Sequence, residues 1–160
     1  MRDLIGSLLS AIATLLGIAA VVALGYNLYS SNKSSNALAD LTSMGGNIQA
    51  LYSSHPSYTG LSATVVINSS LAPSQMVSGT SLVNPWGGTV TVAANSSNSA
   101  LFDVTEPSVP ADACAKMATG VGNLAALSIN STSVTVPVDP ATAASNCSSS
   151  SNSLVFTFGH

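Results

Sequence analysis

The chain has 160 residues, of which 46% are hydrophobic and only 6% are charged, and its formal net charge is -3 at pH 7. Because about a quarter of the residues in a typical soluble protein are charged, hydroxyl and amide groups must solvate most of this surface. The chain has only three Lys and Arg residues, too few for the basic patch that a nucleic-acid-binding surface needs. The length suffices for a stem and one small domain.

The N-terminal segment is apolar and uncharged over a long stretch. After Arg2 and Asp3, no charged residue appears until Lys33, and residues 4–29 are almost entirely apolar or small. About 20 such residues cross a bilayer core as a helix, which satisfies its own backbone polar groups in lipid. We therefore predict a membrane-held stem that carries a soluble head outside the cytoplasm.

The stem helix is predicted to continue beyond the membrane. Gly45 and Gly46 lie in this continuation, where each costs about 1 kcal/mol relative to alanine and offers a place for a kink. We predict a stem over residues 1–52, apolar over residues 1–29, and a head over residues 53–160. The continuation is amphipathic because apolar side chains recur at steps of four and three residues: Ala37, Leu41, Met44, Ile48 and Leu51.

The head begins with a turn-rich segment in which Pro56 ends any helix. Residues 72–77 predict a short helical turn, and Pro110 sits in the first turn of a predicted helix. Residues 141–152 are predicted to be a polar loop. Runs of β-branched and aromatic residues predict strands at residues 64–67, 89–92, 101–104, 133–138 and 154–158.

These elements predict an α+β head. Its antiparallel sheet would have four or five strands, with one or two helices on one face. The long stem helix would pack on the other face of the sheet.

The only cysteines, Cys114 and Cys147, both lie in the head. Two cysteines in an exported domain usually form a disulfide, and this one would close a loop of about 33 residues worth roughly 3–4 kcal/mol. The alternative is a pair of buried free thiols. The two cysteines and two scattered histidines do not supply a metal ligand set, so we predict no metal site.

The sequence contains no recognisable catalytic constellation. It has no phosphate-binding loop and no paired-carboxylate motif, and His55 and His160 have no acid or nucleophile pattern near them. The serine run at residues 148–151 has no base to activate it. We therefore predict no catalytic residue, no cofactor and no enzymatic activity.

The chain resembles the type IV pilins, and specifically the type IVb class of thin pili. The resemblance rests on the apolar N-terminal helix with its amphipathic continuation, and on the cysteine pair near the C-terminus. It also rests on TSLVNPWGGTVTV at residues 80–92 and on VPADACAKM at residues 109–117. These features run in the same order through most of the chain.

The resemblance implies a type IV pilin fold, in which a long N-terminal helix packs on an antiparallel sheet and the head has a C-terminal disulfide loop. It implies the major structural subunit of a filament that serves adhesion, aggregation or conjugation. The partners would be further copies of the chain, the inner membrane before assembly, a prepilin peptidase and the assembly machinery, and host or neighbouring cell surfaces. Met1 would be the processed and methylated N-terminus; the other reading is an initiator residue.

One departure from the family concerns the charges at the N-terminus. The family usually has a glutamate where this chain has Ile5, and that carboxylate is thought to pair with the N-terminal amine of a neighbouring subunit. A buried charge needs such a partner. We expect Asp3 to take this role by pairing with a neighbour's Met1 amine or Arg2; alternatively, Arg2 and Asp3 pair locally at the level of the lipid headgroups.

Two further sets of residues follow from the resemblance. In the head, Trp86 is expected to pack into the core, with carbohydrate stacking as the alternative, and its turn is Asn84, Pro85, Trp86, Gly87 and Gly88. Gly17, Ala20 and Gly25 permit close helix packing, are places where the helix loosens, or are ordinary small residues of a membrane segment. The expected filament-core residues are Leu4, Ile5, Leu8, Leu9, Ile12, Leu15, Leu16, Gly17, Ile18, Val21, Val22 and Gly25.

Two other functions remain open at this level. The first is a minor pilin or a secretion-system pseudopilin, because tip subunits often lack the glutamate that Ile5 replaces. The second is a membrane-anchored or secreted binding domain, with Ala23, Leu24 and Gly25 as a cleavage site. The amphipathic continuation argues against cleavage there, because it would leave half a helix.

Overall fold

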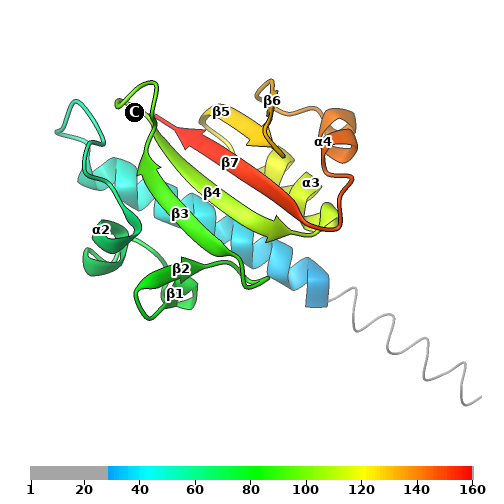
Figure 1. Cartoon of the computed structure of the whole chain (residues 1–160), viewed down its shortest axis with the longest axis horizontal. Helices are drawn as coiled ribbons and strands as arrows, with labels where there is room; N and C mark the ends of the chain where they lie inside the picture. Colours follow the sequence, from blue (N-terminus) through cyan, green and yellow to red (C-terminus); the bar gives the residue numbers. More distant parts are fainter. Residues whose placement is uncertain (1–28, 160) are drawn as a thin grey trace, which may run out of the picture. The chain divides into compact units, whose positions relative to one another are not determined.

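The structure, a computed structural model, describes residues 29–159 (Figure 1). The chain divides into two compact units, residues 1–33 and residues 34–160. In the first unit the described residues are helical, and the Lys33 Nζ atom lies 4.6 Å from the centroid of the Tyr29 ring, a cation–π distance. Among the residues described, no helix has the length and apolarity needed to cross a membrane. The division into stem and head at residue 52 stays a prediction.

The described helix runs from residue 29 to residue 51, and in the second unit it packs against the head. Four members of the predicted apolar stripe are buried, so the amphipathic helix is confirmed. Leu51 is 45% exposed and does not belong to the buried face. The buried members are Ala37, Leu41, Met44 and Ile48.

Helical structure continues unbroken through Gly45 and Gly46. A Cβ atom at Gly45 would lie 3.2 Å from Cε1 of Phe158, whereas one at Gly46 would meet no atom within 4 Å. Gly45 therefore lets the aromatic ring of the last strand approach the helix backbone closely.

The predicted strand at residues 64–67 is wrong, because this segment forms helix α2 (Ala63–Asn68). The Ser62 hydroxyl caps the helix by accepting a hydrogen bond from the Val65 backbone N–H at 3.4 Å. Only Val66 is buried. The cap and the single inward side chain outweigh the strand preference of the β-branched residues. The 3₁₀ helix η1 (Ser74–Met76) follows, inside the predicted helical turn.

The sheet has seven strands in the order β1-β2-β3-β4-β7-β5-β6, and all neighbouring strands are antiparallel. The C-terminal strand β7 thus lies inside the sheet, between β4 and β5 (Figure 1). The sheet is larger than the four or five strands predicted. The strands are β1 (Val77–Ser78), β2 (Ser81–Val83), β3 (Thr89–Ala94), β4 (Phe102–Val109), β5 (Leu124–Ile129), β6 (Thr132–Val134) and β7 (Asn152–Phe158).

Three predicted strands, in β3, β4 and β7, are confirmed. The strand predicted at residues 133–138 ends at Val134 as β6, because Pro137 has no N–H to donate to a ladder. Strand β5 was not predicted, since its sequence, LAALSI, has no strong strand propensity. Its pairing with β7 places it in the sheet.

Helix α3 (Ala111–Gly120) follows β4 and confirms the predicted helix start. The predicted loop at residues 141–152 is wrong over its first half, which belongs to helix α4 (Pro140–Asn146). The Asp139 carboxylate caps α4 by accepting hydrogen bonds from the backbone N–H groups of Ala141 at 3.0 Å and Thr142 at 3.1 Å. A proline in the first turn adds to this start signal.

The helix of residues 34–51 and α3 cover the same face of the sheet (Figure 1), so the prediction that they lie on opposite faces is wrong. A Cβ atom at Gly120, at the end of α3, would lie 2.8 Å from Cδ2 of Leu38 in the long helix. On β3, Val90 and Val92 are buried and the alternate residues are exposed. Strands with this alternation can bury one face only.

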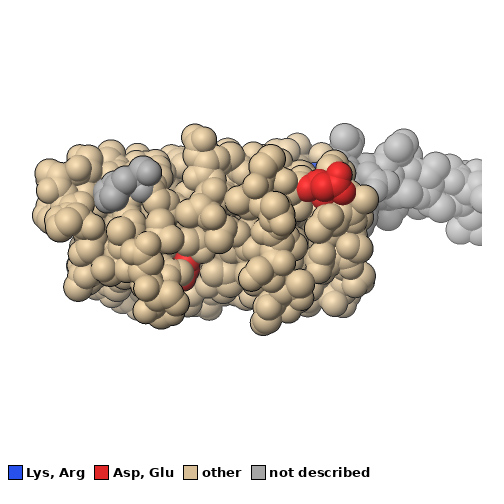
Figure 2. Space-filling model, turned by 90° about the horizontal axis from the view of Figure 1, so that it is seen from above, with Lys and Arg blue, Asp and Glu red and all other residues tan. Residues whose placement is uncertain are grey.

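The head surface carries few charges. Figure 2 shows one face, on which acidic side chains form small isolated patches among uncharged residues. This agrees with the 6% of charged residues in the sequence.

Candidate assembly site

The head turn, Asn84–Gly88, is organised by the side chain of Asn84. Its Oδ1 atom accepts hydrogen bonds from the backbone N–H groups of Trp86 at 3.2 Å and Gly88 at 2.8 Å. Its Nδ2 atom donates to the carbonyl oxygen of Pro107 in β4 at 2.6 Å. A single amide side chain therefore closes the turn and joins it to the sheet.

Glycine is required where the turn meets β4. A Cβ atom at Gly88 would lie 2.5 Å from the carbonyl oxygen of Pro107, closer than real Cβ contacts. Gly87 has a φ of +82°, in the left-handed region that favours glycine. Trp86 is partly buried and packs against the hydrophobic core. These contacts explain why the NPWGG segment has asparagine at position 84, tryptophan at position 86 and glycine at positions 87 and 88.

Glu106 lies beside the head turn on the buried face of β4, and it is 1% exposed. Burial raises the pKa of its carboxyl to about 7; a hydrogen bond from the Asn84 side chain lowers it, and the charge of Asp40 raises it. Sequence reasoning did not single out Glu106. Its burial could have been recognised from the alternation along the strand, because Glu106 follows the buried Phe102 and Val104 at two-residue steps and so lies on the same face.

The two cysteines form a disulfide that joins helices α3 and α4. Cys114 lies in α3, Cys147 caps the end of α4, and their Cα atoms are 5.7 Å apart. Both residues are buried. The predicted pairing is confirmed, and the alternative of free thiols is excluded.

The predicted residues of the N-terminal segment lie outside the described residues. This applies to the charge pair of Met1, Arg2 and Asp3 and to methylation of Met1. It also applies to the filament-core set, which stays a prediction: Leu4, Ile5, Leu8, Leu9, Ile12, Leu15, Leu16, Gly17, Ile18, Val21, Val22 and Gly25.

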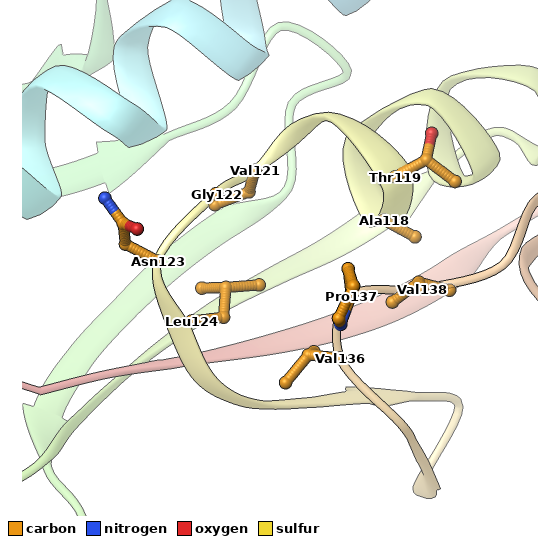
Figure 3. Close-up of a pocket in the computed structure, with 9 residues that line it drawn as sticks. All are labelled: Ala118, Thr119, Val121, Gly122, Asn123, Leu124, Val136, Pro137 and Val138. Atoms are coloured by element: carbon orange, nitrogen blue, oxygen red, sulfur yellow. The ribbon is translucent and has the colours of Figure 1, made fainter.

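A hollow lies where the end of α3, the start of β5 and residues 136–138 meet (Figure 3). Its volume of about 190 Å³ is below the roughly 300–1,000 Å³ of typical ligand sites. Side chains such as Val121, Leu124 and Val136 line it, and none of its lining residues is charged. Within residues 29–159, no three His, Cys, Asp or Glu side chains form a group suited to a metal ion.

Solved structures with the same arrangement define the fold class. The type IVb pilin from Salmonella typhi matches with a TM-score of 0.67 and 23% identity over 79% of this chain and 99% of that chain. TcpA, a type IV pilin from Vibrio cholerae, matches with a TM-score of 0.59 and 13% identity over 79% and 98% of the two chains. The head therefore has the type IV pilin fold.

Sequence comparison gives the family. A family model described as "PilS N terminal" matches residues 31–159. The major structural subunit of bundle-forming pilus from Escherichia coli O127:H6 is 31% identical over 173 aligned residues, covering 90% of this chain and 89% of that protein. Its counterpart from E. coli O111:H- matches equally well. The chain belongs to the PilS family of type IVb pilins.

Proposed function

We propose that this chain is the major structural subunit of a type IVb pilus, a filament built from many copies of it. The observation that carries the proposal is the 31% identity to the major structural subunit of bundle-forming pilus, which extends over 90% of this chain. The amphipathic helix of residues 34–51 also supports it, because its apolar stripe is buried in the head and the apolar segment of residues 4–29 precedes it in the sequence.

Assembly would work through the apolar segment of residues 4–25. As a subunit leaves the inner membrane, this segment exchanges lipid contact for contact with neighbouring helices, so apolar burial changes little. Close packing at Gly17 and Gly25 would then stabilise the filament core. Asp3 would pair with the Met1 amine or Arg2 of a neighbour, because an unpaired charge in apolar surroundings is costly.

The proposed assembly of the subunit into a filament has two stages. The monomer waits in the inner membrane, where a prepilin peptidase exposes Met1 and the new N-terminus is methylated. The assembly machinery then adds the subunit to a filament on the cell surface. The heads would form the shell, and their nearly uncharged surface would favour contacts with other filaments, host cells or neighbouring cells, as adhesion, aggregation or conjugation require.

The role we propose is structural rather than catalytic. Buried polar side chains such as Asn84 and Asn152 form hydrogen bonds that hold elements together. The hollow at the end of α3 is lined by uncharged side chains.

A minor pilin or secretion-system pseudopilin is the second candidate. The observation in its favour is Ile5, which replaces the glutamate usual in major subunits of the family. Abundance separates the two functions, because a major subunit makes up most of the filament mass.

The test is intact mass and N-terminal sequencing of filaments sheared from cells, without reductant. We expect one predominant protein that begins at methylated Met1 and is lighter by two hydrogens because of the disulfide. Traces of this chain within filaments of another protein would support the minor pilin. A chain that begins near Tyr26, or that occurs only in membranes, would overturn the filament function.

A further inference from the structure

Glu106 is a buried acid without a counter-ion in the described part of the chain. It is 1% exposed, and its Oε2 atom has no hydrogen-bond partner there. The Asn84 side chain forms a hydrogen bond with Glu106, but this amide is neutral and does not balance the charge of a carboxylate. A carboxylate in this position loses its hydration without gaining an ion pair, whereas a protonated carboxyl tolerates burial far better.

A second buried acid, Asp40, lies on the long helix. Asp40 is 6% exposed, and its negative charge acts on Glu106. The Oδ1 atom of Asp40 accepts a hydrogen bond of 2.6 Å from Nε2 of Gln75, at the 3₁₀ helix. Burial raises the pKa of the Asp40 carboxyl and this hydrogen bond lowers it. Glu106 has a hydrogen bond from the Asn84 side chain, but its Oε2 atom has no partner among the described residues.

The other elements packed around Glu106 bring no charge to it. Strands β3 and β7, which flank β4, contain no titratable residue, and neither does the head turn. On α3, Asp112 and Lys116 lie on the exposed side of the helix. Asp40 is the one charged group that affects Glu106 among the residues described.

We propose that Glu106 and Asp40 form a carboxyl latch, which holds the helix of residues 34–51 on the sheet when Glu106 is protonated and loosens this contact when Glu106 is ionised. The two acids belong to the helix of residues 34–51 and to β4, and both elements bury apolar side chains in the core of the head. Ionisation of Glu106 places a second negative charge between them, and the desolvation cost and the repulsion from Asp40 both oppose the closed contact.

The pH range of the latch follows from the protonation of Glu106. Its pKa is raised from 4.5 to about 7 in the folded head. The stabilising effect of the bound proton is therefore complete below pH 4.5 and is lost as the pH rises through about 7. Acid tightens the contact between helix and sheet, and mildly alkaline pH loosens it.

The test uses the full-length chain in detergent micelles. Hydrogen exchange, corrected for the intrinsic effect of pH, is measured at pH 5 and pH 8.5 on peptides from residues 34–51 and 102–109. We expect the wild type to open roughly tenfold more often, or more, at the higher pH. We expect Glu106→Gln to open equally at both values, because an amide of the same shape does not ionise.

Two further variants test the role of Asp40 and control for the loss of a carboxylate elsewhere on β4. Asp40→Asn removes the repulsion, so the increase should shrink; Asp103→Asn, on the opposite face of the same strand, should leave the increase unchanged. Carboxyl carbon NMR of the wild type should give a Glu106 titration midpoint near 7, and Asp40→Asn should lower it. A midpoint near 4.5, or the full increase in Glu106→Gln, would overturn the latch.

Discussion

At position 88 the chain has no room for a side chain. The Cβ position of Gly88 lies 2.5 Å from the carbonyl oxygen of Pro107 and 3.0 Å from Nδ2 of Asn84. The oxygen belongs to backbone inside a sheet and cannot move away cheaply. The same amide is the anchor of the head turn, so a clash there also disturbs its hydrogen bonds.

We therefore expect Gly88→Ala to lower the free energy of unfolding of the full-length chain by about 1–3 kcal/mol, as overpacking usually does. Denaturant unfolding followed by tryptophan fluorescence measures it, since Trp86 lies in the turn. Gly46→Ala is the matched control. A Cβ atom there meets nothing within 4 Å, and alanine should stabilise the helix by about 0.5–1 kcal/mol. Equal effects of the two substitutions would contradict this account.

At the residue scale, the sequence indicated the turn but not its role in the head. NPWGG contains turn residues that are recognisable from their backbone preferences. The bond from Asn84 to Pro107 joins positions 23 residues apart, and no local pattern indicates it. For Glu106, the alternation along β4 indicated a buried position. The influence of Asp40 could not be predicted, because it depends on how the long helix packs on the sheet.

At the scale of elements, the disulfide joins α3, which buries four residues in the core, to α4, which has little other support. Helix α4 has seven residues and buries only Ala143. Such a helix is marginal by itself, because nucleation is costly and short helices depend on tertiary contacts. Cys114 and Cys147 hold α4 against α3 through a loop that spans 33 positions.

We expect the double substitution Cys114→Ala and Cys147→Ala to lower the free energy of unfolding by about 2–5 kcal/mol, the usual cost of losing a native disulfide. Denaturant titration of the full-length chain measures this loss. The wild type treated with reductant should behave in the same way, which separates loss of the bond from loss of the sulfur atoms. If neither treatment shifts the midpoint, the packing of α3 and α4 does not depend on the bond.

Local signals predicted most of the elements, and helix capping and tertiary context explain the exceptions. The stripe of the long helix and the alternation of β3 and β7 are periodic, so they could be found directly. Residues 64–67 have strand propensity but form α2, where Ser62 caps the helix. Strand β5 has little strand propensity but forms a strand, because β7 offers it a ladder of hydrogen bonds.

At the scale of the whole molecule, we expect the N-terminal charges to decide whether subunits can join. Asp3 is the only carboxylate before Asp40. If it pairs with a neighbour's amine in an apolar filament core, removing it leaves a buried charge uncompensated, which typically costs about 3–5 kcal/mol. The buried apolar side chains of the described head lie between residues 37 and 158.

We therefore expect Asp3→Ala to reduce sheared filaments strongly at unchanged cellular abundance of the subunit, as measured by quantitative immunoblotting. Asp3→Glu, which keeps the carboxylate, should retain part of the yield. The thermal unfolding midpoint of the head should be the same in both variants. Wild-type filament yield from Asp3→Ala would show that Asp3 does not form the pair.

The sequence by itself determined the apolar segment, its amphipathic continuation, the α+β class and the resemblance to type IVb pilins. These features depend on composition, on periodicity and on short motifs, which are properties of neighbouring residues. Only the tertiary structure decided that α3 and the helix of residues 34–51 share one face of the sheet. It alone brought Glu106 near Asp40, because contacts between distant segments depend on how whole elements pack rather than on any local pattern.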